Sequence, residues 1–229
     1  MKIGIIGAGF IGRAVAQRLL NADHEVLLSN SRGPKTLTSV AAGIRGARIG
    51  TVEEAAALGD TVLVAIPFEH YRNLSAYLLK GKIVLDANNY YPERDGHIPA
   101  LDNRETTTSQ LLAAHLSQST VVKVFNAILA ADLLTDARPR GAQDRRALPI
   151  ASDDSQAMQQ VADLLDAMGF DCVKTGGLAE SWRFERAKPA YCARLNTEGL
   201  IQALADAQRD VDLEHGSWRH QAPNLDPVG

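Results

Sequence analysis

The sequence is short of cysteine and has no residue spacing typical of a metal site. Its two cysteines are Cys172 and Cys192, and two thiols in a chain of 229 residues make neither a disulfide scaffold nor a set of metal ligands. The six histidines are scattered, without metal-ligand spacing to one another or to a cysteine. We therefore expect no bound metal, two small buried thiols, and the reducing environment of the cytoplasm.

An excess of positive charge and long apolar runs are also missing. With 24 basic and 27 acidic residues, the net charge of -3 gives no electrostatic footprint for nucleic acid or an anionic membrane. The longest apolar stretch, TVLVAIPF from Thr61, is too short to span a bilayer. The start, MKIGII, is too short an apolar run for a signal peptide. The sequence predicts a soluble, cytoplasmic protein without nucleic-acid partners or membrane insertion.

What the sequence does have is a regular alternation of strand-like and helix-like segments. Runs such as TVLVAI and KIVLDA lack polar alternation, as is typical of central strands buried on both faces. The predicted strands span 2–6, 25–29, 61–66, 82–86, 120–125, 146–151 and 170–174, and predicted helices include 10–21, 52–58 and 154–167. Thr51 with Glu54, and Asp153 with Gln156, form capping-box patterns before two of these helices. The pattern predicts a doubly wound α/β fold with a mostly parallel sheet and helices on both faces.

The remaining segments indicate the domain organisation. We expect a domain over 1–178 and a short C-terminal helical extension with a tail over 179–229, packed on the same domain. Residues 88–106 have no hydrophobic period and predict a long loop, and 209–229 are polar and contain proline. Helices within 178–208 would offer apolar faces that close the core or pair with a second copy, so a homodimer is also expected.

A glycine-rich turn follows the first predicted strand. In KIGIIGAGFIG the first glycine permits a tight turn, the second lets the backbone approach a pyrophosphate, and the third lets the helix pack close to the strand. The following helix N-terminus offers free N–H groups to the same pyrophosphate. This context favours a dinucleotide site of the Rossmann type over a turn that is only structural. The expected cofactor-binding residues here are Gly7, Ala8, Gly9, Phe10, Ile11 and Gly12.

The second predicted strand ends without the acid that NAD-binding proteins place there. The nearby acid, Glu25, opens that strand, whereas Asn30, Ser31 and Arg32 follow its end and Lys35 lies just beyond. Hydroxyl groups and a guanidinium suit the 2′-phosphate of NADP(H), because arginine can bind two of its oxygens at once. We therefore expect NADP(H); the alternative is a solvated arginine in a turn.

The ends of the next strands are expected to face the same ligand. Ile66 and Pro67 would form an apolar wall for a nicotinamide ring. His70 follows them, although a lone histidine at a helix start is more often a surface or capping residue. Asn88 and Asn89 would either hold the nicotinamide ribose or carboxamide, or form an Asx turn.

Several of these segments, in this order, resemble one family. GIIGAGFIG, SNSRG, AIPFEH, VLDANN and VVKVFNAI are similar to segments of the deazaflavin (coenzyme F-420)-dependent NADP oxidoreductases, a family that includes the NADPH-binding domain of STEAP-type ferric reductases. The resemblance covers roughly the first 135 residues well and the later βαβ unit from 146 to 178 more loosely.

The resemblance implies roles for individual residues. It places the 2′-phosphate on Ser31, Arg32 and Lys35, and a flavin-like ring against the nicotinamide. It also implies that Ile66, His70, Ala87 and Ala127 lie along the cofactor. The segment VFNAI would border the second ring, which makes Asn126, together with Asn89, a candidate for binding the substrate. Val124 and Ala127 depart from the family pattern there, so the acceptor stays open.

The function expected from these features is hydride transfer between NADP(H) and a small electron acceptor such as a deazaflavin, flavin, ferric chelate or quinone. No catalytic side chain is assigned, because nicotinamide and flavin-type rings supply this chemistry themselves. One alternative is an imine or pyrroline reductase or a β-hydroxyacid-type dehydrogenase, although the helical material after residue 178 is short for those enzymes. The other is a non-catalytic, NADPH-binding redox sensor.

Overall fold

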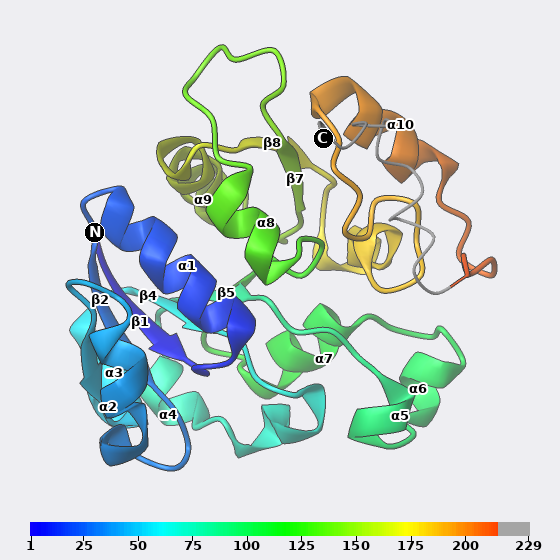
Figure 1. Ribbon diagram of the computed structural model, residues 1–229. Helices are drawn as coiled ribbons and strands as arrows, with labels where there is room; N and C mark the ends of the chain where they lie inside the picture. Colours follow the sequence, from blue (N-terminus) through cyan, green and yellow to red (C-terminus); the bar gives the residue numbers. More distant parts are fainter. Residues whose placement is uncertain (215–229) are drawn as a thin grey trace.

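The computed structural model describes residues 1–214 and is built around a six-stranded parallel sheet (Figure 1). Its strands are β1 (Lys2–Ile6), β2 (Glu25–Ser29), β3 (Arg48–Gly50), β4 (Thr61–Val64), β5 (Ile83–Asp86) and β6 (Thr120–Lys123). They lie in the order β3-β2-β1-β4-β5-β6, so the winding direction reverses between β1 and β4. In such a sheet a ligand binds at the carboxyl ends of the strands beside that reversal. The predicted doubly wound α/β fold is confirmed.

Both faces of this sheet are buried because successive strand residues point to opposite sides. On one face, Ile5 and Leu63 pack against Val15 of helix α1 (Phe10–Asn21). On the other face, Val62 and Val84 pack against residues of α3 (Val52–Leu58) and α7 (Thr108–His115). The smaller elements at the sheet are η1 (Pro34–Leu37), α2 (Thr38–Ala42), η2 (Phe68–Asn73), α4 (Ala76–Leu79) and α8 (Ala130–Thr135).

The last two strands form a sheet of their own. β7 (Ala147–Ile150) and β8 (Asp171–Lys174) pair in parallel, with α9 (Ser155–Met168) between them in sequence. A single antiparallel bridge, Lys123 to Ala151, connects this pair to the end of β6. The chain continues through the 3-10 helix η3 (Leu178–Phe184) to α10 (Thr197–Asp206), which packs against β7 and β8.

The structure differs from the sequence-based expectations in four places. Strand β3 was not expected, and segment 88–106 contains two short helices, α5 (Pro92–Asp95) and α6 (Pro99–Asp102), where a loop was predicted. Helix α9 is capped by Asp154, whose side chain accepts two backbone N–H groups, while Asp153 instead accepts the N–H of Leu178. The helical extension expected over 178–208 has a long irregular segment between η3 and α10. The tail expected over 209–229 lies outside the described residues from 215 onward.

Candidate cofactor-binding site

The glycine turn joins β1 to α1 with the close approach expected from its spacing. Gly7 has a φ of 115°, and a Cβ there would collide with the carbonyl of Ala65 at the end of β4. A Cβ on Gly12 would likewise collide with the carbonyl of Gly7. A side chain at either position would therefore push the turn away from the helix or from β4.

The same turn leaves free backbone donors at the start of α1. The first intrahelical bond runs from the N–H of Arg13 to the carbonyl of Gly9, and no side chain caps this helix. The N–H groups of Phe10, Ile11 and Gly12 therefore have no partner within the helix, and its first turn contains no acidic residue. A Cβ built on Gly9 meets no atom within 4 Å, so the space beside these donors is open. This geometry fits a bound pyrophosphate.

The loop after β2 is fixed by Asn30, and it leaves two polar side chains available. The Asn30 carboxamide accepts the N–H of Arg32 at 3.0 Å and donates to the hydroxyl of Thr36 at 2.9 Å. Both Ser31 and Arg32 are exposed, and within residues 1–214 the Arg32 guanidinium forms no ion pair or hydrogen bond. The structure thus uses Asn30 to shape the loop and leaves the hydroxyl and the guanidinium for a ligand.

These parts meet in a cavity of about 540 Å3 at the carboxyl ends of β1, β2 and β4. Among the predicted cofactor residues it is lined by Gly7, Ala8, Gly9, Asn30, Ser31, Arg32, Ile66, Pro67 and His70. No aspartate or glutamate lines it, and one arginine does. A cavity with a guanidinium and no carboxylate fits a 2′-phosphate better than it fits the bare ribose hydroxyls of NAD.

Other predicted residues lie outside this cavity. Lys35 is exposed on η1, while Ala87 and Ala127 are buried. Phe10 is 79% exposed beside the mouth of the glycine turn. The structure adds lining residues that the sequence argument missed: Ile6, Val52, Ala65, Asn73 and Leu74. Val52 begins α3 directly after the unexpected strand β3, so a prediction of that strand would have indicated it.

Asn88, just after β5, is fixed by hydrogen bonds, and one N–H donor of its side chain has no partner. Its backbone N–H donates to the Asp86 carboxylate at 2.9 Å, and its side-chain oxygen accepts the N–H of Ile66 at 2.9 Å. Its Nδ2 is buried and has no hydrogen-bond partner. A buried amide donor without a partner costs free energy unless a ligand accepts its hydrogen bond. Asn88 does not itself line the cofactor cavity, so its role in ligand binding stays a prediction.

A buried ion pair next to Asn88 fixes the position of its backbone. The Lys123 ammonium and the Asp86 carboxylate are fully buried and lie 3.3 Å apart. Lys123 also donates to the carbonyl of Asn88 at 2.5 Å and to the hydroxyl of Thr108 at 2.9 Å, and Ser109 donates to Asp86 at 2.6 Å. Burying both charges is costly, but the additional hydrogen bonds reduce that cost and fix the backbone at Asn88.

The two candidate substrate residues form a cluster with each other. The Asn89 side chain donates to the carbonyl of Asn126 at 2.9 Å, and the Asn126 side chain donates to the carbonyl of Phe184 at 2.9 Å. The side-chain oxygen of Asn126 is buried and has no partner. Phe125, just before it, has a φ of 64°, a strained conformation for a bulky residue. We call Asn89, Asn126 and the Phe184 carbonyl the asparagine cluster.

Neither cysteine is arranged as a nucleophile. Burial raises the pKa of Cys192 to about 12, which keeps its thiol protonated at neutral pH. Burial also raises the pKa of Cys172, which is half-buried on β8. Within residues 1–214 there is no cluster of three or more potential metal ligands, and no helix there is long and apolar enough to cross a membrane.

Comparison with known proteins places this geometry in context. Residues 2–90 match the model of the family described as NADP oxidoreductase, coenzyme F420-dependent. The metalloreductase STEAP3 of Rattus norvegicus is 32% identical over 186 residues, which are 80% of this chain and 36% of that protein. The chain therefore spans about a third of the length of this relative.

Two solved structures are similar over most of the chain. A hypothetical protein from Sinorhizobium meliloti is 29% identical, with a TM-score of 0.75 over 86% of this chain and 96% of that one. A candidate coenzyme F420-dependent NADP reductase from Arthrobacter sp. FB24 is 24% identical, with a TM-score of 0.68 over 79% of this chain and 87% of that one. At that identity the second structure supports the fold alone.

Proposed function

We propose that the chain is a member of the coenzyme F420-dependent NADP oxidoreductase family, whose model matches residues 2–90, and that it transfers a hydride between NADP(H) and a flavin-type or deazaflavin acceptor. The observation that carries this proposal is the cavity at the strand reversal, which combines free helix N–H groups with a guanidinium and contains no carboxylate. The S. meliloti structure, similar over nearly its whole length, supports the fold that positions this cavity.

The side chains around the cavity have separable roles in this proposal. The N–H groups at the start of α1 bind the pyrophosphate, and Ser31 and Arg32 bind the 2′-phosphate, with Lys35 just beyond them on η1. Ile66 and Pro67 border the nicotinamide and help to exclude water. The Asn88 Nδ2 group, which has no partner within the protein, donates to the nicotinamide ribose or carboxamide.

The acceptor is proposed to lie against the asparagine cluster. In that position bound NADPH would supply the hydride that, with one proton from solvent, would reduce an oxidised flavin-type ring to its dihydro form and leave NADP⁺. The protein's part is to hold the two rings close and parallel in a dry site, which is a matter of position and not of a titrating side chain. Asn126 offers a buried acceptor oxygen that fits a ring N–H.

The first experiment is a titration of the protein with NADPH and with NADH at fixed ionic strength, followed by nicotinamide fluorescence. We expect NADPH to bind at least tenfold more tightly than NADH. Replacing Arg32 by Ala should remove most of that difference, because the guanidinium is the group expected to bind the 2′-phosphate. Turnover with flavins, a deazaflavin, quinones and ferric chelates then tests the acceptor.

Arg45→Ala is the matched control, because Arg45 is also an exposed arginine but precedes β3, at the amino end of the strands and away from the cavity at their carboxyl ends. It should leave the preference for NADPH unchanged. Equal binding of NADH and NADPH by the natural protein would contradict the role given to the loop after β2. Tight NADPH binding without turnover on any acceptor would favour a redox sensor. Turnover on imines alone would favour an imine or pyrroline reductase. Cytoplasmic localisation and a homodimer stay predictions from the sequence.

A further inference from the structure

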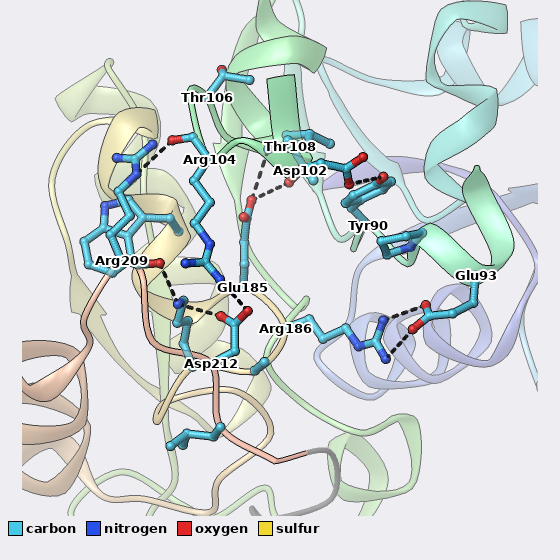
Figure 2. A pocket seen from close by; sticks show the side chains of 16 residues that line it. Tyr90, Glu93, Asp102, Arg104, Thr106, Thr108, Glu185, Arg186, Arg209 and Asp212 are labelled. Carbon is cyan, nitrogen blue, oxygen red and sulfur yellow. Dashed lines mark hydrogen bonds and ion pairs between the residues drawn. The ribbon is translucent and has the colours of Figure 1, made fainter. Parts of the chain in front are cut away.

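A second cavity, of about 390 Å3, lies between segments 90–108 and 182–213 (Figure 2). We call it the arginine pocket, because three arginines line it, Arg104, Arg186 and Arg209, together with Lys188. It shares no lining residue with the cofactor cavity. The family resemblance described above assigns no role to any residue that lines it.

The arginine pocket lies directly beside the asparagine cluster. Asn89 and the carbonyl of Phe184 both bond to Asn126, and the residues that follow them, Tyr90 and Glu185, line the pocket. A molecule whose ring lies against the asparagine cluster can therefore extend a substituent into the pocket. The two sites are suited to two parts of one ligand.

Most charges of the pocket are already paired within the protein. Figure 2 shows Arg186 pointing toward Glu93 and Arg104 toward Asp212, with contacts of 2.8 Å and 2.7 Å. Burial alone would raise the pKa of Asp212, but Lys188 and Arg104 hold it below the ordinary value, so this carboxylate stays ionised and paired. Lys188 also donates to three backbone carbonyls in segment 208–211.

Arg209 is the exception among these basic side chains. Its Nε donates to the backbone carbonyl of Arg104 at 3.1 Å, and its guanidinium lies 5.6 Å from the centre of the Trp182 ring. No carboxylate within residues 1–214 pairs with it. Its two terminal nitrogen atoms thus remain for a ligand, on a guanidinium already oriented by the ring and the carbonyl.

Glu185 supplies the complementary hydrogen-bonding group. Its Oε1 accepts the N–H and the hydroxyl of Thr108 at 3.0 and 2.7 Å, whereas its Oε2 has no partner within residues 1–214. Arg104 and Ala187 line the same pocket with φ values of 58° and 66°. Such backbone conformations are unfavourable for these residues and tend to occur at ligand sites.

We propose that the arginine pocket binds the side chain of the flavin-type acceptor, a hydroxylated chain that ends in a phosphate. Arg209 binds the phosphate, Glu185 accepts hydrogen bonds from the chain hydroxyls, and the ring lies against the asparagine cluster. This assignment rests on the proposed function, because it concerns the acceptor of the same hydride transfer. It makes Arg209 a determinant of acceptor specificity.

The test compares FMN with riboflavin, which share one ring and differ in the terminal phosphate. With NADPH saturating and its absorbance followed, we expect the KM for FMN to be at least tenfold below that for riboflavin. Arg209→Ala should bring the two KM values within twofold of each other. Arg140→Ala is the control, because Arg140 is an exposed arginine that pairs with Asp166 outside this pocket. It should preserve the tenfold difference.

Quenching of flavin fluorescence, measured without NADPH, gives a second readout that does not depend on turnover. Equal KM and equal binding of FMN and riboflavin would overturn the role of the arginine pocket and leave the proposed function standing. Tighter binding of FMN that Arg209→Ala abolishes, without NADPH oxidation, would support the pocket and contradict hydride transfer to flavins. Failure to bind or reduce either flavin would contradict the role of the arginine pocket and hydride transfer to flavins, while transfer to a deazaflavin would be decided by the acceptor screen above.

Discussion

At the residue scale, Asn88 is a buried polar residue that we predict to contact the cofactor. Three bonds fix it: its N–H donates to Asp86, its carbonyl accepts from Lys123, and its side-chain oxygen accepts from Ile66. The fourth group, Nδ2, is left buried without a partner. An amide that is oriented by three bonds and whose donor is left without a partner is a candidate for binding a ligand that accepts from that donor.

Replacing Asn88 by Asp tests this prediction, since the change keeps an oxygen for the N–H of Ile66 but replaces the free donor with an acceptor and adds a buried negative charge. We expect the Kd for NADPH to rise about tenfold or more, equivalent to about 1.4 kcal/mol. That is within the roughly 1–3 kcal/mol cost of an unsatisfied buried group. The measurement is the same fluorescence titration, with the melting temperature recorded in parallel.

Asn103→Asp provides the control, because Asn103 is an exposed asparagine at the end of α6. It should change NADPH affinity by less than twofold. If Asn88→Asp bound NADPH as tightly as the natural protein, Asn88 would not contact the cofactor, and its amide would serve the turn alone.

At the scale of elements, sequence patterns predicted those parts of the fold that depend on neighbours along the chain. Helix α1 spans 10–21 as expected, and the capping box of Thr51 and Glu54 begins α3 at Val52. Strand β3 was not predicted, because its three residues, Arg48 to Gly50, are too few to show an alternating pattern. Pairing with β2 holds them in place. The cap of α9 was misplaced by one residue because Asp153 and Asp154 have equal local propensity, and the distant N–H of Leu178 decides between them.

The buried pair of Asp86 on β5 and Lys123 on β6 is a contact between elements that no local pattern indicates. Lys123→Met would leave the Asp86 carboxylate buried without its counter-charge, so we expect the free energy of unfolding to fall by about 3–5 kcal/mol. Urea unfolding followed by circular dichroism measures this loss.

The double variant, Asp86→Asn with Lys123→Met, separates the ion pair from simple loss of packing. Because it removes both charges, we expect it to be more stable than Lys123→Met alone, although it contains one substitution more. The single variant Asp86→Asn completes the comparison. If the stability lost by the double variant equalled the sum of the losses of Asp86→Asn and Lys123→Met, the two charges would not interact, contrary to the 3.3 Å distance between them.

At the scale of the whole molecule, the cofactor cavity was largely predictable and the arginine pocket was not. The cavity collects residues that follow strand ends, and the topology of a parallel sheet brings such residues together. The arginine pocket depends on contacts such as Glu93 with Arg186, which are far apart in sequence and follow no repeating pattern. Packing of η3 and α10 also uses Phe184, Leu200 and Leu204 in the core, while Ile201 stays 53% exposed.

These contacts lead us to propose that segment 179–213 folds together with residues 1–178. Ala127 accepts the N–H of Cys192 at 3.1 Å, and the N–H of Ala147 donates to Leu195 at 2.9 Å. The fully buried Arg146 guanidinium binds both Asp132 on α8 and the carbonyl of Ala193. Bonds that cross from the extension to β7 and α8 favour a single cooperative unit over an appendage that unfolds alone.

Unfolding followed by two probes tests this cooperativity. Both tryptophans, Trp182 and Trp218, follow residue 178, so their fluorescence reports on the C-terminal part, whereas far-UV circular dichroism reports mainly on the helices and strands before it. We expect the two urea transitions to have the same midpoint and slope, and Trp218→Phe to leave Trp182 as a single reporter with the same midpoint. A fluorescence transition at lower urea would show that the extension unfolds first. The arginine pocket, whose walls come from both parts, would then be lost before the cofactor cavity, and reduction of FMN would fail at urea concentrations where NADPH still binds.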